Sequence, residues 1–173
     1  MHDPLAVISQ MEKVDFIALF SRIYEHSEWV AEALWRQKSQ NPDGYFDSID
    51  KIRLAMADIV EQSSDEQKLI LLRAHPDLAG KAALAGQLTQ ESTAEQAGAG
   101  LDQCTPEELT QFLQLNDTYR EKFGFPFIMA VKGATKEQIL MGFETRMPND
   151  WQTEFDRAMS EVHKIAGFRL ADL

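Results

Sequence analysis

Cysteine is almost absent from this chain: Cys104 is the single cysteine among 173 residues. A disulfide within the chain is therefore excluded, and a reducing compartment is favoured. No window approaches the ~18 consecutive apolar residues that a membrane-spanning helix needs. The first residues also lack the basic stretch followed by an apolar one that marks a secretory signal. We therefore expect a cytoplasmic protein that has no membrane partner.

Positive charge is also scarce. The chain has 17 Lys and Arg against 28 Asp and Glu, a formal net charge of −11. So acidic a chain repels the phosphate backbone, which excludes nucleic acid as an expected partner. A small anionic substrate would need a local cation inside a cleft. The length and the 44% share of hydrophobic residues are those of an ordinary globular protein, so we expect one domain spanning 1–173.

The signatures of common cofactor sites are missing as well. The four histidines (His2, His26, His75 and His163) are scattered, and no metal-ligand spacing joins them to Cys104. Neither of the glycine-rich phosphate loops occurs, and there is no G-x-S-x-G elbow. We therefore expect no metal site and no organic cofactor.

Most of the chain has the periodicity of amphipathic helices. The expected helices cover 14–25, 28–37, 47–62, 65–74, 105–123, 135–146 and 150–170. Start signals precede several of them: Ser64 with Gln67, Thr105 with Glu108, and Thr135 with Gln138 are capping boxes. Gly124 is placed to end one helix, and residues 41–44 predict a turn.

Only 125–131 has the character of an extended segment, and one such run cannot form a sheet. The expected fold is therefore all-α: a single-domain, irregular helical bundle of about seven to nine helices.

The first unusual stretch contains His75 and Pro76. Because proline disfavours helical geometry in the residue before it, we expect the helix to break at His75. Pro76 can then begin the next helix. An imidazole at such a break can point into a cleft, and it titrates near neutrality, which suits proton transfer. The alternative is a histidine that only bonds a local carbonyl.

The second stretch is residues 89–101. Ser92 and Glu95 have the spacing of a capping box, and Gln96 follows them. A purely structural helix would not carry Gly98 and Gly100, since each costs ~1 kcal/mol relative to alanine. Glycine also permits a close approach of backbone to backbone or to a ligand. Both interpretations, a simple cap and a ligand-binding helix, remain open at this point.

The third stretch is residues 123–133, which include the extended segment. A lone extended segment leaves its N–H and C=O groups without a ladder, so other partners must satisfy them. A helix end, water or a planar ligand with amide-like edges could do so. The alternative is a buried connector.

Together these stretches resemble the 2-oxo-4-hydroxy-4-carboxy-5-ureidoimidazoline (OHCU) decarboxylase family. The matching residues are Glu25-His26-Ser27, Trp29-Val30-Ala31, His75-Pro76-Asp77-Leu78, residues 92–101, Asn116, residues 119–127, Lys132-Gly133, Arg146, Asn149, Glu161-Val162 and Lys164-Ile165-Ala166. Two departures occur: Glu28 stands where the family usually has proline, and Met147-Pro148 follows Arg146.

The resemblance implies cofactor-free decarboxylation of OHCU to (S)-allantoin during urate breakdown. It implies that His75 donates the proton, that Glu95 binds ring or ureido N–H groups and biases the charge state of His75, and that Arg146 orients the substrate carboxylate. It also implies that Pro76 packs against the ring, and it suggests a homodimer. The remaining substrate-binding groups that it implies are Ser92, Gln96 and the amides of Phe127, Ile128, Met129, Ala130 and Val131.

Two other functions compete with this interpretation. A non-enzymatic helical adaptor would leave His75, Glu95 and Arg146 far apart and on the surface. A cofactor-free lyase or hydrolase acting on a related ureido compound would keep the same pocket but need another substrate.

Overall fold

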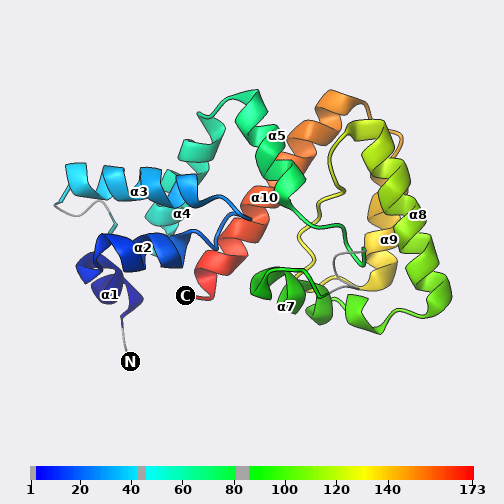
Figure 1. Ribbon diagram of the computed structural model, residues 1–173, viewed down its shortest axis with the longest axis horizontal. Helices are drawn as coiled ribbons and strands as arrows, with labels where there is room; N and C mark the ends of the chain where they lie inside the picture. Colours follow the sequence, from blue (N-terminus) through cyan, green and yellow to red (C-terminus); the bar gives the residue numbers. More distant parts are fainter. Residues whose placement is uncertain (1–2, 43–45, 81–85) are drawn as a thin grey trace. The chain divides into compact units, whose positions relative to one another are not determined.

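The computed structural model describes residues 3–42, 46–80 and 86–173. Within these ranges it contains nine α-helices, one short 3-10 helix and no strand (Figure 1). The prediction of an all-α fold is confirmed, and the helices of the described ranges fall within the expected number. The predicted turn at 41–44 lies partly outside the described residues.

The chain divides into two compact units. One unit comprises Met1–Leu71 with His163–Leu173, and the other comprises Leu72–Val162. Helices α5 (Asp65–Ala74) and α10 (Trp151–Ala171) each contribute residues to both units. The single domain expected from the sequence stays a prediction.

The first unit is built from four complete helices: α1 (Pro4–Gln10), α2 (Lys13–Phe20), α3 (Glu28–Gln40) and α4 (Ile49–Glu61). Helix α3 packs against both α2 and α4. The core between them is apolar, and its fully buried side chains include Phe16, Phe20, Leu34, Ile52 and Met56.

The helix expected over 14–25 is shorter than predicted, because α2 ends at Phe20. The next residues form turns, and His26 takes a positive φ of 48°. Tyr24 and Glu25 are buried in these turns by partners distant in sequence. The Tyr24 hydroxyl lies 2.8 Å from Nδ1 of His163, and Glu25 forms an ion pair of 2.9 Å with Arg169.

The second unit contains α7 (Gln90–Gly98), the 3-10 helix η1 (Leu101–Gln103), α8 (Pro106–Phe123) and α9 (Lys136–Arg146). The predicted helix starts are confirmed, since Thr105 and Thr135 both form complete capping boxes. Gly124 ends α8 with a φ of +78°, which glycine adopts without steric cost. The core is aromatic, and its fully buried rings include Phe112, Tyr119, Phe125, Phe127 and Phe143.

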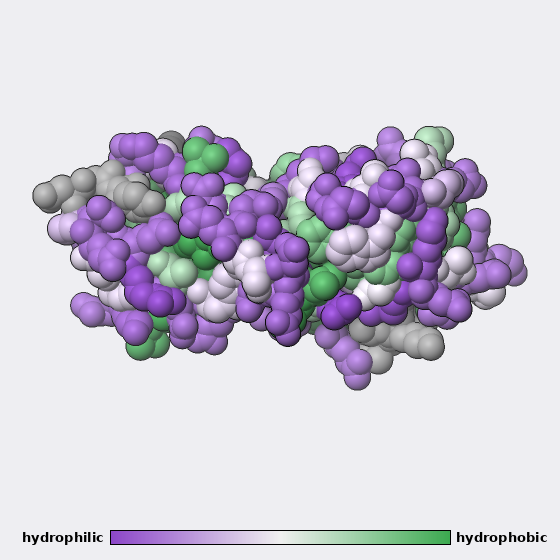
Figure 2. Space-filling view, turned by 90° about the horizontal axis from the view of Figure 1, so that it is seen from above, coloured by the Kyte–Doolittle hydropathy of each residue, from purple (hydrophilic) through white to green (hydrophobic). Residues whose placement is uncertain are grey.

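The face of the molecule drawn in Figure 2 is mostly polar. Hydrophilic residues dominate the face seen in Figure 2, with only small hydrophobic areas between them, as expected for a net charge of −11. In the part of the chain that the structure describes, none of the helices combines the length and the apolar character that crossing a membrane requires.

Candidate functional site

His75 lies where α5 stops. Helix α5 ends at Ala74, and the His75 amide still donates to the Leu72 carbonyl at 3.2 Å. The predicted break at His75 is therefore confirmed. Its side chain is buried, at 6% exposure. The expectation that Pro76 begins the next helix is wrong, because 76–80 is non-helical.

The turn after His75 has an unusual backbone. Ala79 takes a positive φ of 52°, which costs a non-glycine residue about 1–2 kcal/mol. Gly80 has no room for a side chain, since an added Cβ would lie 2.5 Å from the Cβ of Asp77. This conformation therefore needs external support.

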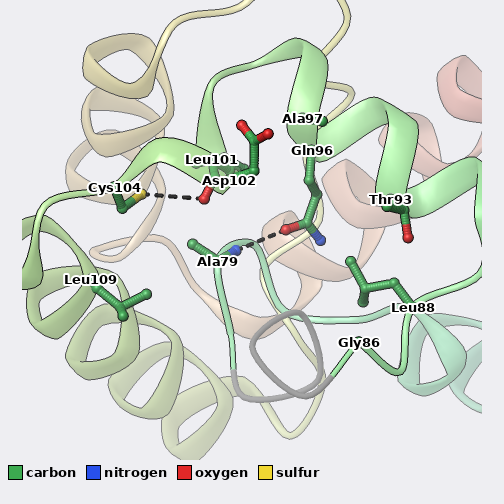
Figure 3. A pocket seen from close by; sticks show the side chains of 10 residues that line it. All are labelled: Ala79, Gly86, Leu88, Thr93, Gln96, Ala97, Leu101, Asp102, Cys104 and Leu109. Atoms are coloured by element: carbon green, nitrogen blue, oxygen red, sulfur yellow. Dashed lines mark hydrogen bonds between the residues drawn. The ribbon is translucent and has the colours of Figure 1, made fainter.

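Gln96 supplies much of that support. Its side-chain oxygen accepts the Ala79 amide proton at 3.0 Å, and its side-chain nitrogen donates to the Asp77 carbonyl at 3.1 Å. Figure 3 shows the Gln96 side chain pointing toward Ala79. The two hydrogen bonds connect α7 directly to the turn that follows His75.

Helix α8 supports the same turn from another element. Asn116 is buried, and its side-chain nitrogen donates to the Leu78 carbonyl at 2.8 Å. Arg120 forms an ion pair of 2.6 Å with Asp77. Side chains of α7 and α8 therefore bind three successive residues of the turn, 77–79.

The Ser92-Glu95 spacing does not form a cap, so that prediction is wrong. Thr89 is the N-cap of α7, and its hydroxyl accepts the Ser92 amide proton at 3.2 Å. Ser92 therefore lies inside the helix, where Ser92, Glu95 and Gln96 share one face. Ser92 and Gln96 are buried and Glu95 is half-buried. Because Gln96 contacts the turn, this face of α7 is directed toward the His75 region.

The extended segment finds its missing partners in side chains. Residues 126–131 form neither a helix nor a turn. Arg146 of α9 donates through Nη1 to the Ile128 carbonyl at 2.6 Å. The Ala130 amide donates to Glu161 of α10 at 3.2 Å. Phe127, Ile128 and Val131 are buried, whereas Met129 and Ala130 are half-buried.

Arg146 itself is part of a buried network. Its guanidinium forms an ion pair of 2.9 Å with Glu154, and it stacks 4.4 Å from the centre of the Phe127 ring. The Tyr119 hydroxyl and the Asn149 side-chain nitrogen also donate to Glu154. Arg146 is 3% exposed and Glu154 is fully buried. The network holds the guanidinium in one place and neutralises its charge.

Ionisation of Glu154 is favoured by this network. Burial opposes the charged carboxylate, but hydrogen bonds from Arg146, Tyr119 and Asn149 outweigh burial and hold the pKa of Glu154 below its ordinary value. Burial raises the pKa of Tyr119 far above its usual range, and its hydrogen bond to Glu154 adds to this effect. Tyr119 therefore stays a neutral donor.

A cavity of about 380 Å³ lies beside α7 and is lined in part by Gln96 (Figure 3). The other lining residues are Ala79, Gly86, Leu88, Thr93, Ala97, Leu101, Asp102, Cys104 and Leu109. Most of this lining is apolar, and burial raises the pKa of the Cys104 thiol.

The structure thus places the predicted site residues in two groups. The turn with His75 and Pro76 is connected to the α7 face that carries Ser92, Glu95 and Gln96. Arg146 is connected to the segment 127–131. Across the described ranges, no group of three or more His, Cys, Asp or Glu side chains could hold a metal ion.

Sequence reasoning missed several residues that build these groups, among them Asp77, Asn116, Glu154 and Glu161. Asp77, Asn116 and Glu161 lie within the matching segments, but their partners are distant in sequence. Glu154 had no local signal, because a carboxylate in an amphipathic helix is usually solvated.

Comparison with known proteins identifies the family. The OHCU decarboxylase family model matches residues 9–171. A 2-oxo-4-hydroxy-4-carboxy-5-ureidoimidazoline decarboxylase of Haloferax volcanii is 44% identical, over 99% of this chain and 97% of that protein. One from Halalkalicoccus jeotgali is 43% identical, over 96% of this chain and 89% of that protein.

A solved structure agrees with these relatives. The crystal structure of an (S)-allantoin synthase superposes with a TM-score of 0.77 at 34% identity, and the match covers 97% of this chain. This chain spans about half of that one, 53% of its length. On the family match and these identities, the chain belongs to the OHCU decarboxylase family.

Proposed function

We propose that this protein decarboxylates OHCU to (S)-allantoin in urate breakdown, without a metal or an organic cofactor. Family membership and the names of its relatives support this activity. The observation that carries the proposal in the structure is the double hydrogen bond from Gln96 to the turn after His75. It connects the expected proton donor to the helix that bears the expected substrate-binding groups.

The reaction makes few chemical demands. The bond between the ring and the carboxylate breaks, CO₂ leaves, and the electron pair moves into the adjacent imine and carbonyl system of the substrate. A proton then adds to one face of the resulting carbanion or enolate. The protein has to orient the substrate and deliver that proton from one side.

His75 is the proposed proton donor. It lies at a helix break, and the following turn is bound by Gln96, Asn116 and Arg120. Because these side chains hold the backbone next to His75, the donor approaches the substrate from one direction. Protonation on a single face follows, and the product is one enantiomer.

The α7 face supplies the proposed contacts to the ureido group. Glu95 accepts N–H groups of the substrate and biases the charge state of His75, and Ser92 adds a hydrogen bond. Both hydrogen-bonding atoms of the Gln96 amide already bind the turn. Gln96 therefore acts in this proposal mainly by placing His75, and Pro76 packs against the ring.

Backbone groups of Phe127, Ile128, Met129, Ala130 and Val131 complete the proposed substrate site. The Ala130 amide is already bound by Glu161, so the contribution falls to its neighbours. An amide-like heterocycle edge is a suitable partner for such groups.

The expected role of Arg146 as the carboxylate-binding residue stays a prediction. Its ion pair with Glu154 argues against a second carboxylate on the same guanidinium, because the charge is already neutralised. Within the site, Arg146 donates to the Ile128 carbonyl and stacks on the ring of Phe127.

Optical activity tests the proposal. OHCU is generated in situ from urate with the two preceding enzymes, and circular dichroism follows the product. Spontaneous decay gives a racemate, since protonation in water has no preferred face. The protein should accelerate the loss of OHCU and produce (S)-allantoin. No change in rate or optical activity would refute the assignment.

The two competing functions make different predictions. An adaptor would expose its key residues, yet His75 and Arg146 are both buried. A lyase or hydrolase for a related ureido compound would turn over other members of a panel of ureides faster than OHCU. Equal or better turnover of another ureide would favour that alternative.

A cytoplasmic location and a homodimer complete the proposal. The single cysteine supports the location, and the family resemblance suggests the dimer. Cell fractionation tests the first, and sedimentation velocity of the purified protein tests the second.

A further inference from the structure

Two buried carboxylates lie along one face of α10. Glu154 and Glu161 are seven positions apart, which is two turns of an α-helix, and fully buried Ala158 lies between them. Glu161 is 3% exposed. Buried carboxylates are costly unless they are paired, so their partners reveal what they do.

Each carboxylate is connected to one residue of the segment 126–131. Glu154 binds Arg146, and Arg146 donates to the Ile128 carbonyl at 2.6 Å. Glu161 accepts the Ala130 amide proton directly at 3.2 Å. The two contacts therefore hold the carbonyl of Ile128 and the amide of Ala130, which lies two residues further along the chain.

The spacing of these two contacts determines which edge of the segment remains available to a ligand. In an extended chain the N–H and C=O of one residue point to the same edge, and successive residues alternate between the two edges. Ile128 and Ala130 share an edge, which faces their partners from α9 and α10. The backbone N–H and C=O groups of Met129 then point to the opposite edge. Among the described residues, no protein group accepts the Met129 amide proton.

We propose that Glu161 and the Glu154–Arg146 pair are positioning residues that present the N–H and C=O of Met129 to the substrate. The ligand class is a cyclic ureide, whose adjacent C=O and N–H complement these two backbone groups. The inference rests on the proposed decarboxylase function and narrows the backbone contact to one residue. It also separates these carboxylates from the proton transfer assigned to His75.

Substitutions at Glu161 test the proposal through KM and kcat. Glu161→Ala removes the acceptor of the Ala130 amide and should raise KM about tenfold, while kcat changes less than about threefold. Glu161→Gln keeps an oxygen acceptor and should restore KM to within about threefold of wild type. An unchanged KM in folded Glu161→Ala, or equal defects in both variants, would overturn the proposal.

Arg157→Ala is the matched control. Arg157 forms an ion pair of 2.9 Å with Glu161 on the exposed side of α10. Its removal eliminates that pair but leaves the Ala130 hydrogen bond, so KM should stay at the wild-type value. A tenfold rise in KM for this variant would show that charge, and not the hydrogen bond, matters.

Amide hydrogen exchange in the wild-type protein tests the same idea without a variant. The Ala130 amide should exchange slowly with and without (S)-allantoin, and the Met129 amide should become protected only when allantoin is added. An unprotected Met129 amide at saturating allantoin would overturn the proposal. If the protein neither decarboxylates OHCU nor binds allantoin, the proposed function fails, while slow Ala130 exchange would still confirm its hydrogen bond.

Discussion

The side-chain oxygen of Gln96 accepts the amide proton of Ala79 at 3.0 Å, at the residue whose φ is +52°. The strained residue of the turn after His75 is therefore bound by the helix that carries Ser92 and Glu95. This relationship connects the turn that follows the expected donor to the helix that carries the expected binding groups.

Gln96→Ala should lower kcat/KM at least tenfold and destabilise the fold by about 1–3 kcal/mol, because the Ala79 amide and the Asp77 carbonyl lose their partner. Steady-state kinetics and urea unfolding measure the two effects. Thr93→Ala is the control on the same helix, since the Thr93 hydroxyl bonds only within the first turn of α7 among the described residues. Wild-type kinetics for Gln96→Ala would contradict the positioning role.

His75→Asn should reduce kcat by about a hundredfold or more, because asparagine cannot donate a proton as an acid. The melting temperature should change little, since asparagine is polar and fits the same break before Pro76. Kinetics with freshly generated OHCU and thermal unfolding provide the test. Near wild-type turnover in this variant would remove His75 from the mechanism.

Glu154→Gln should destabilise the protein by about 2–4 kcal/mol at neutral pH, because it leaves buried Arg146 without its counter-charge. The pKa of Glu154 is lower in the folded chain than its ordinary value. Its ionisation therefore stabilises the fold above its unfolded pKa, about 4.3, and this stabilisation is lost as pH falls through the folded pKa.

Urea unfolding as a function of pH checks the sign of this effect. The difference between wild type and Glu154→Gln should be largest at neutral pH and should narrow as the pH falls below about 4. Asp156→Asn is the control, because Asp156 is on the exposed side of α10 and bonds Gln152 there. A difference that grows on acidification would contradict the assignment.

Exhaustive chelation should leave the decarboxylase activity unchanged, since the sequence has no metal-ligand spacing. The measurement is the rate of (S)-allantoin formation before and after treatment with a chelator and removal of the metal complex. Loss of activity that one divalent ion restores would show that the reaction needs a metal.

Some features of the fold could be predicted because their causes are local. The capping boxes at Thr105 and Thr135 and the glycine at 124 act within a few residues, and the structure contains all three. The break at His75 is also local, since Pro76 acts on the residue before it. A local cause also explains the wrong prediction that Ser92 is the N-cap. Thr89, three residues earlier, caps α7 instead.

Other features depend on partners that a local pattern does not contain. The helix predicted to reach Glu25 ends at Phe20, and Arg169, distant in sequence, pairs with Glu25. The candidate site has the same character. The role of Arg146 at a substrate carboxylate stays a prediction, and the ion pair of its guanidinium with Glu154 had no signal in the local sequence.

The sequence by itself determined the all-α class, the helix starts at Thr105 and Thr135, the break at His75 and the family resemblance. These depend on short-range backbone preferences and on the order of motifs along the chain. Only the tertiary structure decided that Gln96 binds the turn at 77–79, and that Arg146 and Glu161 bind the same edge of one short segment, at Ile128 and Ala130. The physical reason is that a buried polar group must find a partner wherever packing places one, and that partner is fixed by the folded chain and not by its neighbours in sequence.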